Sequence, residues 1–388
     1  MKHYFITIFT ILLLTGCATS DINSVIRAAT SNDPVSAFGL LAKNKSIYYV
    51  QNPDKLSKDI KAFSNFMNGI SGEWGEENVA LPKKKEYVKY MQNYKSRAFV
   101  DFDTGIIRVE TLDTENTKSS LKNAIVTTLL LPDDPRGADL YSAKEVKLGS
   151  TPYLLGEVKD DQNKDIRYSW RASRYADILI NNSYQTKNIT SSGSSKRVAF
   201  VEIPMVKDHA DIRVSKYKSI VDKFSKKYNI SRNLIYAIIQ TESNFNQFAV
   251  SHTGAYGLMQ IVPSSAGTDA YKYAKGKSWK PTKSYLFNAQ NNIELGVAYL
   301  SILDTRYLKG IYNDISREYC VICAYNTGSG NVLKAFSQNR TEAKRIINSK
   351  KPSQIYKELR TNLKYEEPRK YLKKVVNYKK DFIRLWVT

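Results

Sequence analysis

Apolar residues recur along this chain in two different patterns, and the change falls near residue 206. Up to that point, segments with helical spacing are mixed with segments that alternate as strands do. Beyond it, apolar residues recur almost only at helical spacing. The pattern predicts an α+β protein with two domains: a small α+β domain over residues 17–206 and a mainly helical domain over residues 207–388.

In the first domain, the pattern predicts helices packed against a sheet. Residues 54–70 predict a helix, and residues 117–131 predict another that ends at the sequence PDDP. The segment SRAFVDFDTGIIRVETL predicts a hairpin that turns at Asp103-Thr104-Gly105. Further strands are predicted at residues 153–158, 165–170 and 196–206, with a loop over residues 188–196.

The start of the chain, MKHYFITIFTILLLTGC, has the pattern of an export signal. Its apolar run is shorter than the roughly 20 residues that span a bilayer as a helix. The ending Leu14-Thr15-Gly16-Cys17 resembles the lipobox of bacterial lipoproteins, although an ordinary signal peptide remains the alternative. The resemblance implies removal of residues 1–16 and a lipid on Cys17, and Ala18 after it is similar to proteins sorted to the outer membrane, facing the periplasm.

The net charge of +22 adds a constraint on partners. A basic surface favours nucleic acid, acidic lipids or a wall polymer with carboxylates, unless it serves solubility alone. An export signal argues against nucleic acid. Cys320 and Cys323 form a C-x-x-C inside a helical pattern, where core packing is favoured over a redox pair or half of a metal site. We therefore expect neither a metal nor an organic cofactor.

One acidic residue stands out in the helical domain. In SRNLIYAIIQTES, Ser231 is placed to cap a helix, and Leu234, Ile238 and Glu242 follow one another at intervals of four. Glu242 therefore projects from the buried face, close to the C-terminal end of the helix. Burial and the helix dipole both disfavour a negative charge there. A carboxylic acid kept protonated suits glycosidic cleavage, in which the leaving oxygen needs a proton. The structural alternative is that Glu242 pairs with a buried Arg or Lys.

Three motifs follow in order: ES-x-F-N at 242–246, GLMQI at 257–261 and AYN-x-G-x-G at 324–330. Together they resemble the signature of lytic transglycosylases with the soluble-type catalytic domain, which has a lysozyme-like fold. The N-terminal half resembles the accessory domain of membrane-bound members. The resemblance implies that Glu242 is the single catalytic acid and base, and that peptidoglycan strands are cut without water to leave 1,6-anhydro-N-acetylmuramic acid.

The same resemblance implies a set of substrate-binding residues. Gln260 would bind an N-acetyl group or hydroxyl, and Met259 would pack on the face of a sugar. For Ser251 a role in a turn is as reasonable as a contact with the reacting sugar, and Asn326 has the alternative of a helix cap. The full set that the resemblance places in the cleft is Ser251, Met259, Gln260, Tyr325, Asn326 and Tyr371.

Two departures and two rival functions accompany this interpretation. Gln247 stands where relatives usually carry proline, and Tyr256 replaces a small residue, which affects substrate preference more than chemistry. A hydrolytic muramidase on the same fold would need a second carboxylate such as Asp269 to activate water. A non-catalytic peptidoglycan-binding lipoprotein would keep the groove and lose the chemistry.

Overall fold

The computed structural model describes residues 53–140, 142–251 and 254–384, which form two compact units. Within the described residues, the first unit extends to Ile212 and also takes in Phe248–Ala255. The second comprises Arg213–Gln247 and the chain from Tyr256 onward. The division after Ile212 lies close to the boundary expected after residue 206, and the grouping of Phe248–Ala255 with the first unit is a tertiary feature without a local sequence pattern.

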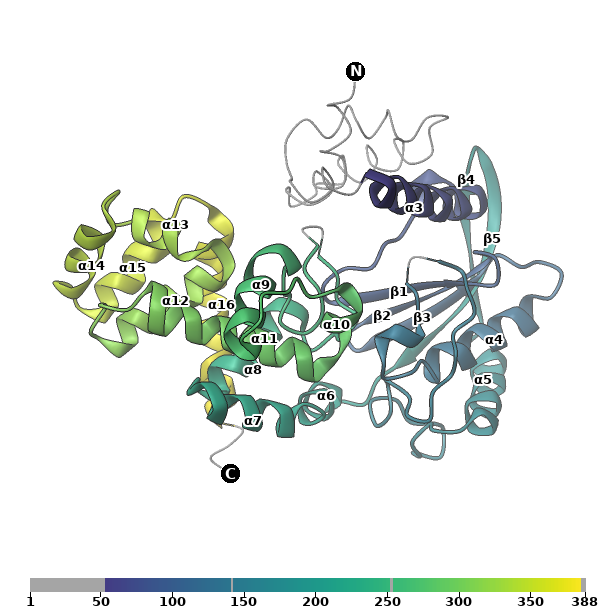
Figure 1. Ribbon diagram of the computed structural model, residues 1–388. Helices are drawn as coiled ribbons and strands as arrows, with labels where there is room; N and C mark the ends of the chain where they lie inside the picture. Colours follow the sequence, from purple (N-terminus) through teal and green to yellow (C-terminus); the bar gives the residue numbers. More distant parts are fainter. Residues whose placement is uncertain (1–52, 141, 252–253, 385–388) are drawn as a thin grey trace, which may run out of the picture. The chain divides into compact units, whose positions relative to one another are not determined.

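The first unit is built on a five-stranded antiparallel sheet with the order β1-β2-β3-β5-β4 (Figure 1). The predicted hairpin is confirmed: Asp101 pairs with Ile106, and Gly105 takes the positive φ of 69° that the turn needs. The strands are β1 (Glu86–Met91), β2 (Ser96–Asp101), β3 (Ile106–Thr111), β4 (Gln185–Ser191) and β5 (Ser194–Pro204).

Three predictions in this unit are wrong. Residues 188–196 form a second hairpin in place of a loop, with Ser192 and Gly193 at positive φ in its turn. Residues 153–158 make only isolated bridges, because Tyr153 and Leu154 reach the core from turns. Residues 165–170 lead into the helix α5 (Ser169–Ser183) and form no strand.

The apolar core lies between one face of the sheet and two helices, α4 (Thr117–Leu129) and α5. The prediction of α4 is confirmed, and its buried face includes Leu121 and Ile125. Alternation along the strands sends Val100, Ile107 and Val109 to this face. Phe248 joins the same core at 1% exposure, with its ring centroid 4.9 Å from that of Tyr153 and 5.6 Å from that of Tyr87.

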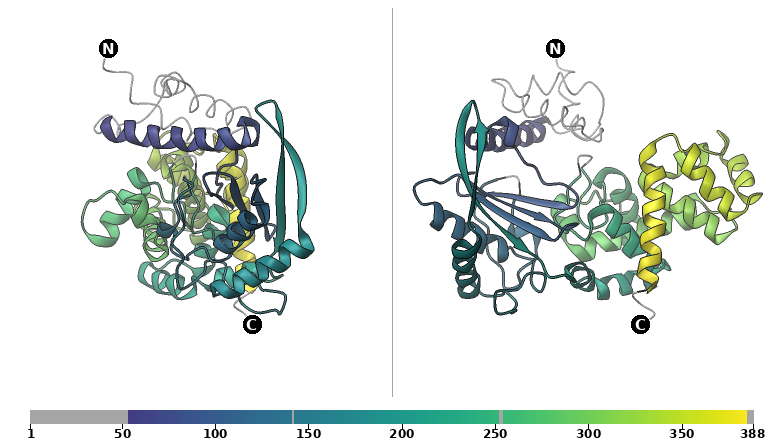
Figure 2. Two further views of the ribbon diagram at one scale, coloured as in Figure 1. Left: turned by 90° about the vertical axis from the view of Figure 1, so that its right-hand side faces the viewer. Right: turned by 180° about the vertical axis from the view of Figure 1, so that it is seen from behind.

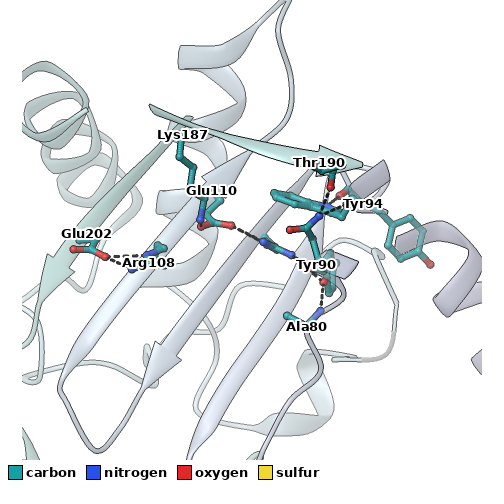
Figure 3. A network of polar contacts seen from close by, with 11 residues as sticks. Ala80, Tyr90, Tyr94, Arg108, Glu110, Lys187, Thr190 and Glu202 are labelled. Atoms are coloured by element: carbon teal, nitrogen blue, oxygen red, sulfur yellow. Dashed lines mark hydrogen bonds and ion pairs between the residues drawn. The ribbon is translucent and has the colours of Figure 1, made fainter. Parts of the chain in front are cut away.

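The opposite face of the sheet carries a polar network beside the helix α3 (Pro53–Trp74), which confirms the first predicted helix (Figure 3). The Glu110 carboxylate accepts hydrogen bonds from Arg97, at 2.9 Å, and from Lys187. The Arg97 guanidinium also lies 3.6 Å from the ring centroid of Trp74. Because Glu110 is buried with two cations as partners, its charge is compensated, and the network fastens α3 to the sheet.

The second unit is helical (Figure 2). The helix predicted after Ser231 is confirmed as α8 (Arg232–Ser243), and the helical pattern around Cys320 and Cys323 is confirmed as α12 (Asp314–Thr327). The helix α7 (Lys218–Tyr228) precedes α8, and α16 (Glu366–Arg384) packs along α8. The other helices of this unit are α9 (Thr268–Lys275), α10 (Lys283–Phe287), α11 (Ala289–Ile302), α13 (Ser329–Lys334), α14 (Arg340–Asn348) and α15 (Pro352–Asn362), with the short helical segments η4 (Pro263–Gly267) and η5 (Leu303–Tyr307). The helix α6 (His209–Ser215) crosses the division between the units, and the short segments η2 (Glu76–Asn78) and η3 (Pro135–Gly137) belong to the first unit.

Cys320 and Cys323 lie in the core of the helical unit, as the sequence predicts. Neither side chain is exposed, and burial raises the pKa of Cys320 to about 12. A thiol so far from ionisation is a poor nucleophile and metal ligand, so these residues act as packing. Among the helices in the described part of the chain, none combines the length and the apolar character needed to cross a bilayer.

Candidate active site

The helix α8 positions the predicted acid. The Ser231 side chain accepts a hydrogen bond from the Leu234 N–H and begins the helix. Asn244 ends it in the left-handed conformation, with its N–H donating to the Gln240 carbonyl at 3.1 Å. Glu242 thus occupies the last turn, on the inward face, and its residue surface is 5% exposed. The local sequence therefore places a single carboxyl at the edge of the helical core.

Two tyrosines from other helices adjoin this carboxyl. Burial raises the pKa of Tyr325 on α12 well above its usual value, and the charge of Glu242 raises it further. Burial and Glu242 act in the same way on the pKa of Tyr371 on α16. The Tyr371 hydroxyl lies beside the Glu242 carboxyl without reaching standard hydrogen-bond geometry. Both tyrosines are therefore protonated at neutral pH and able to donate hydrogen bonds.

The GLMQI segment forms a tight loop between Tyr256 and Ile261, which bond to each other through two backbone hydrogen bonds of 3.1 Å. The Tyr325 hydroxyl donates to the Met259 carbonyl at 2.8 Å. The Ser243 hydroxyl, one residue after Glu242, donates to the Leu258 carbonyl at 2.8 Å. The loop is thus tied to α8 and to α12, the two helices that carry Glu242 and Tyr325.

Asn292 on α11 is a positioning residue that the sequence analysis missed. Its Oδ1 accepts from the Met259 N–H at 2.8 Å, and its Nδ2 donates to the Tyr256 carbonyl at 2.7 Å. Gly257 has a φ of 73°, and a Cβ there would lie 2.5 Å from Asn292 Nδ2. Glycine is therefore required for the loop to approach Asn292. No local pattern in the sequence links these positions.

The predicted residues of the loop have different outcomes. Gln260 is 8% exposed, and its side-chain amide donates to the Gly257 carbonyl at 2.9 Å. Met259 requires a correction: its side chain is completely buried against Gly296, so it packs in the core and does not present a face to a sugar. Its contribution to the site comes from the backbone carbonyl that Tyr325 binds.

Asn326 and Ser251 also have defined local contacts. Asn326 Nδ2 donates to a Glu367 carboxylate oxygen at 3.3 Å, which links the end of α12 to the start of α16. Ser251 belongs to the segment grouped with the sheet unit, where its hydroxyl accepts from the Ala255 N–H at 3.0 Å. These contacts fit the turn role considered for Ser251. Cys17 lies outside the described residues.

Asp269, the second carboxylate that a hydrolase would require, lies in a different setting. It is exposed on α9 and accepts a hydrogen bond from the Tyr307 hydroxyl at 3.3 Å. Burial raises the pKa of Tyr299 to about 12, and the charge of Asp269 adds to the shift. Among the described residues, Glu242 is the one carboxyl that acts on both Tyr325 and Tyr371.

In the described part of the chain, no three His, Cys, Asp or Glu side chains are grouped so as to hold a metal ion. The polar groups of Tyr325, Tyr371 and the loop between Tyr256 and Ile261 are uncharged donors and acceptors: two phenols, a side-chain amide and backbone carbonyls. Such groups bind the hydroxyls and acetamido groups of sugars well. The arrangement can therefore orient a neutral polar substrate against one carboxyl.

Comparisons with known proteins point to one family. The family model described as "Membrane-bound lytic murein transglycosylase C, N-terminal domain" matches residues 49–216, and the family model "Transglycosylase SLT domain" matches residues 219–348. Proteins named membrane-bound lytic murein transglycosylase C from Yersinia pestis (strain Pestoides F) and Yersinia pseudotuberculosis (serotype O:1b) are each 42% identical over 332 residues. They cover 84% of this chain and 91% of their own length.

Two solved structures are also similar. Lytic transglycosylase Slt from Pseudomonas aeruginosa has a TM-score of 0.31 and 24% identity, covering 42% of this chain and 23% of its own. The 70 kDa soluble lytic transglycosylase from Escherichia coli has a TM-score of 0.36 and 17% identity, covering 95% of this chain and 51% of its own. These TM-scores are low, so the assignment rests on the sequence matches. With relatives 42% identical over 84% of its length, the chain belongs to the family of membrane-bound lytic murein transglycosylase C.

Proposed function

We propose that this lytic transglycosylase cleaves the β-1,4 bond between N-acetylmuramic acid and N-acetylglucosamine in peptidoglycan without water. The Glu242 carboxylic acid donates its proton to the glycosidic oxygen. The bond from C1 to that oxygen breaks, its electron pair leaves with the oxygen, and C1 gains oxocarbenium character. The Glu242 carboxylate then accepts the proton of the muramic acid's own 6-hydroxyl as this oxygen bonds to C1. The products are a free 4-hydroxyl and a 1,6-anhydro ring.

One observation carries this proposal: a single buried carboxyl is shared by two protonated tyrosines. Hydrolases of either stereochemistry use a second carboxylate, roughly 5 to 9.5 Å from the first, as nucleophile or base. In the described residues, the charge that acts on both tyrosines comes from Glu242 alone, while Asp269 is bound by Tyr307. This supports a mechanism in which one residue is acid first and base second.

The surrounding residues are assigned to orientation. The Tyr371 hydroxyl, beside the carboxyl, is placed to donate to the carboxylate that forms once the proton has left. Tyr325 holds the loop through the Met259 carbonyl, and the adjoining Gln260 amide supplies donor and acceptor groups to a sugar substituent. Asn326 fastens α12 to Glu367 on α16. Ser251 is a further candidate contact to the reacting sugar.

We also propose a place for the protein in the cell envelope. The lipobox-like ending at Cys17 supports a lipid anchor on that cysteine, and Ala18 after it supports the outer membrane. The name of the family includes "membrane-bound", which is consistent with an anchor of this kind. The enzyme would then face the periplasm, where peptidoglycan is within its reach.

The test is digestion of purified sacculi by the full chain, extracted in detergent, beside the variants Glu242→Gln and Asp269→Asn. The sugar termini of the products are identified by mass spectrometry. Anhydromuramyl ends from the wild type and Asp269→Asn, and none from Glu242→Gln, are expected. Reducing ends that disappear with Asp269→Asn would identify a hydrolase. Binding to sacculi without any product would identify a binding protein.

A further inference from the structure

A pocket lies at the C-terminal end of α12, where the chain passes through α13 toward α14. Its volume is about 240 Å³. This is smaller than the roughly 300 to 1,000 Å³ of pockets for drug-sized ligands, so it suits one small residue better than a disaccharide. The lining residues are Thr327, Gly330, Asn331, Leu333, Lys334, Ser337, Gln338 and Arg340.

The lining is positively charged. It contains two cations, Lys334 and Arg340, and no acidic residue. Among the described residues, neither cation forms an ion pair. The acid next along the chain, Glu342, already accepts hydrogen bonds from Arg345 Nη2 at 2.7 Å and Arg345 Nε at 2.8 Å. The pocket therefore offers two uncompensated cations to an anion.

The remaining lining groups fit the end of a peptide. Asn331 Nδ2 donates to the Thr327 carbonyl at 2.8 Å, while its Oδ1 has no partner among the described residues and is available to a peptide N–H. Leu333 is 3% exposed and provides an apolar contact for a small side chain. A Cβ at Gly330 would meet no atom within 4 Å, so the space above it is open. Cations, an amide acceptor and a small apolar contact together match a peptide carboxyl terminus.

We propose that this pocket binds the terminal carboxylate of a stem peptide attached to the glycan strand. The proposal rests on the proposed function, which makes peptidoglycan the substrate and so supplies peptides that end in carboxylates. Thr327 follows Tyr325 and Asn326 directly on α12. One helix therefore carries a tyrosine of the catalytic cluster and the edge of the pocket. Binding there would favour strands that still carry their peptides.

The first experiment compares two substrates: strands with their stem peptides, and the same strands after an amidase has removed the peptides. The full chain in detergent is tested as wild type and as the double variant Lys334→Gln/Arg340→Gln. We expect KM on peptide-bearing strands to rise about fivefold, since two exposed charge contacts are lost, with kcat unchanged. On peptide-free strands the variant should match the wild type.

A charge-matched control separates this effect from general attraction. The double variant Lys272→Gln/Lys309→Gln removes two exposed cations of the same unit that do not line the pocket. It should leave both KM values as in the wild type. Equal rises in KM for the two pairs, or equal losses on the two substrates, would overturn the proposal. So would an unchanged KM for Lys334→Gln/Arg340→Gln on peptide-bearing strands.

A binding experiment identifies the group that is recognised. A soluble stem tetrapeptide and its C-terminal amide are titrated against Glu242→Gln, with NMR as the readout. The free acid should perturb signals from the pocket, and the amide should bind at least fivefold more weakly. Equal binding of both would overturn the assignment to the terminal carboxylate. Failure of the proposed function has a separate signature, because it would alter the sugar termini that the wild type produces.

Discussion

The Tyr325 hydroxyl donates a hydrogen bond of 2.8 Å to the Met259 carbonyl, and the charge of Glu242 acts on the same tyrosine. The Tyr325 side chain therefore interacts with Glu242 and also binds the loop between Tyr256 and Ile261. Ser243 also donates to the Leu258 carbonyl of this loop, and Asn292 binds the Met259 N–H and the Tyr256 carbonyl. Side chains from three helices therefore hold the loop that carries Gln260.

The variant Tyr325→Phe should lose activity and some stability. Removal of the Tyr325 hydroxyl leaves the Met259 carbonyl without its donor, and an unsatisfied buried carbonyl costs about 1–3 kcal/mol of folding stability. We expect kcat on sacculi to fall about tenfold as the loop loosens. Urea unfolding and release of soluble fragments are the measurements. Tyr319→Phe, on the same helix but packed against Tyr356, is the control and should keep the wild-type kcat; equal losses in both variants would contradict this role.

The variant Gly257→Ala should destabilise the helical unit. A Cβ at this position would lie 2.7 Å from the Leu286 carbonyl oxygen and 2.5 Å from Asn292 Nδ2, at a φ of 73°. The conformational penalty alone is roughly 1–2 kcal/mol, and the clash adds to it. Gly254→Ala is the matched control, because its φ is 69° and a Cβ there would meet no atom of the described residues within 4 Å. Thermal unfolding should show the larger loss for Gly257→Ala.

The sequence predicts the parts of the fold that local patterns determine. Ser231 begins α8 as its capping pattern indicates, and Gly105 turns the first hairpin. The helix α5 was missed because its buried face consists partly of alanines, Ala172 and Ala176, which carry a weak apolar signal. The edge strand β4 was missed because most of its side chains are polar and exposed.

The candidate site divides in the same way. Glu242 is recognisable because it ends an apolar helical face, the AYN-x-G-x-G motif contains Tyr325, and the family resemblance implies Tyr371. Asn292 is not recognisable, because its partners lie more than thirty residues away in the sequence. The burial of Met259 depends on Gly296, a contact between separate segments. The packing of Phe248 into the first unit is likewise a tertiary contact that no local pattern reports.

The variant Phe248→Ala should destabilise the sheet unit. The ring is 1% exposed and contacts Tyr87 and Tyr153 edge to face, so truncation leaves a cavity between them. Such a change costs about 3–5 kcal/mol, and Phe248→Leu should cost less. Hydrogen exchange followed by mass spectrometry would show faster exchange in β1 and the surrounding core. Loss of protection confined to α12 and α16 would contradict the assignment of Phe248 to the first unit.

The stability contributed by Asp160 should depend on pH. Burial would raise the pKa of Asp160, but the Lys164 N–H and the guanidinium groups of Arg171 and Arg174 outweigh it and lower the pKa to about 2. A pKa below the value of the unfolded chain stabilises the folded state above about pH 4, and this contribution disappears as the pH falls toward 2. Asp160→Asn should therefore cost about 1–2 kcal/mol at neutral pH, after allowance for the partly exposed arginines.

The measurement is urea unfolding of wild type and Asp160→Asn at neutral pH and at about pH 3, where the difference should shrink. Asp177→Asn is the control, because Asp177 pairs with Lys122 at the surface and its side chain is 52% exposed. An exposed pair of this kind contributes about 0–1 kcal/mol. A difference for Asp160→Asn that stays constant over this range would show that the carboxylate charge is not what stabilises the folded state.

The variant Tyr371→Phe should separate activity from stability. The Tyr371 hydroxyl is buried without a standard hydrogen bond among the described residues, so its removal should change the free energy of unfolding by less than about 0.5 kcal/mol. If the hydroxyl stabilises the Glu242 carboxylate during the reaction, kcat should fall about tenfold to a hundredfold while KM changes little.

Ser316→Ala is the matched control, because Ser316 is also buried in the helical unit with a hydroxyl that has no partner among the described residues. It should change neither unfolding nor kcat. A wild-type kcat in Tyr371→Phe would show that the hydroxyl takes no part in the reaction and that Tyr371 only packs in the core. A large drop in stability would instead mean that the hydroxyl bonds Glu242 firmly in the resting enzyme. Only a low kcat with unchanged stability fits a donor whose hydrogen bond forms as the carboxylate appears.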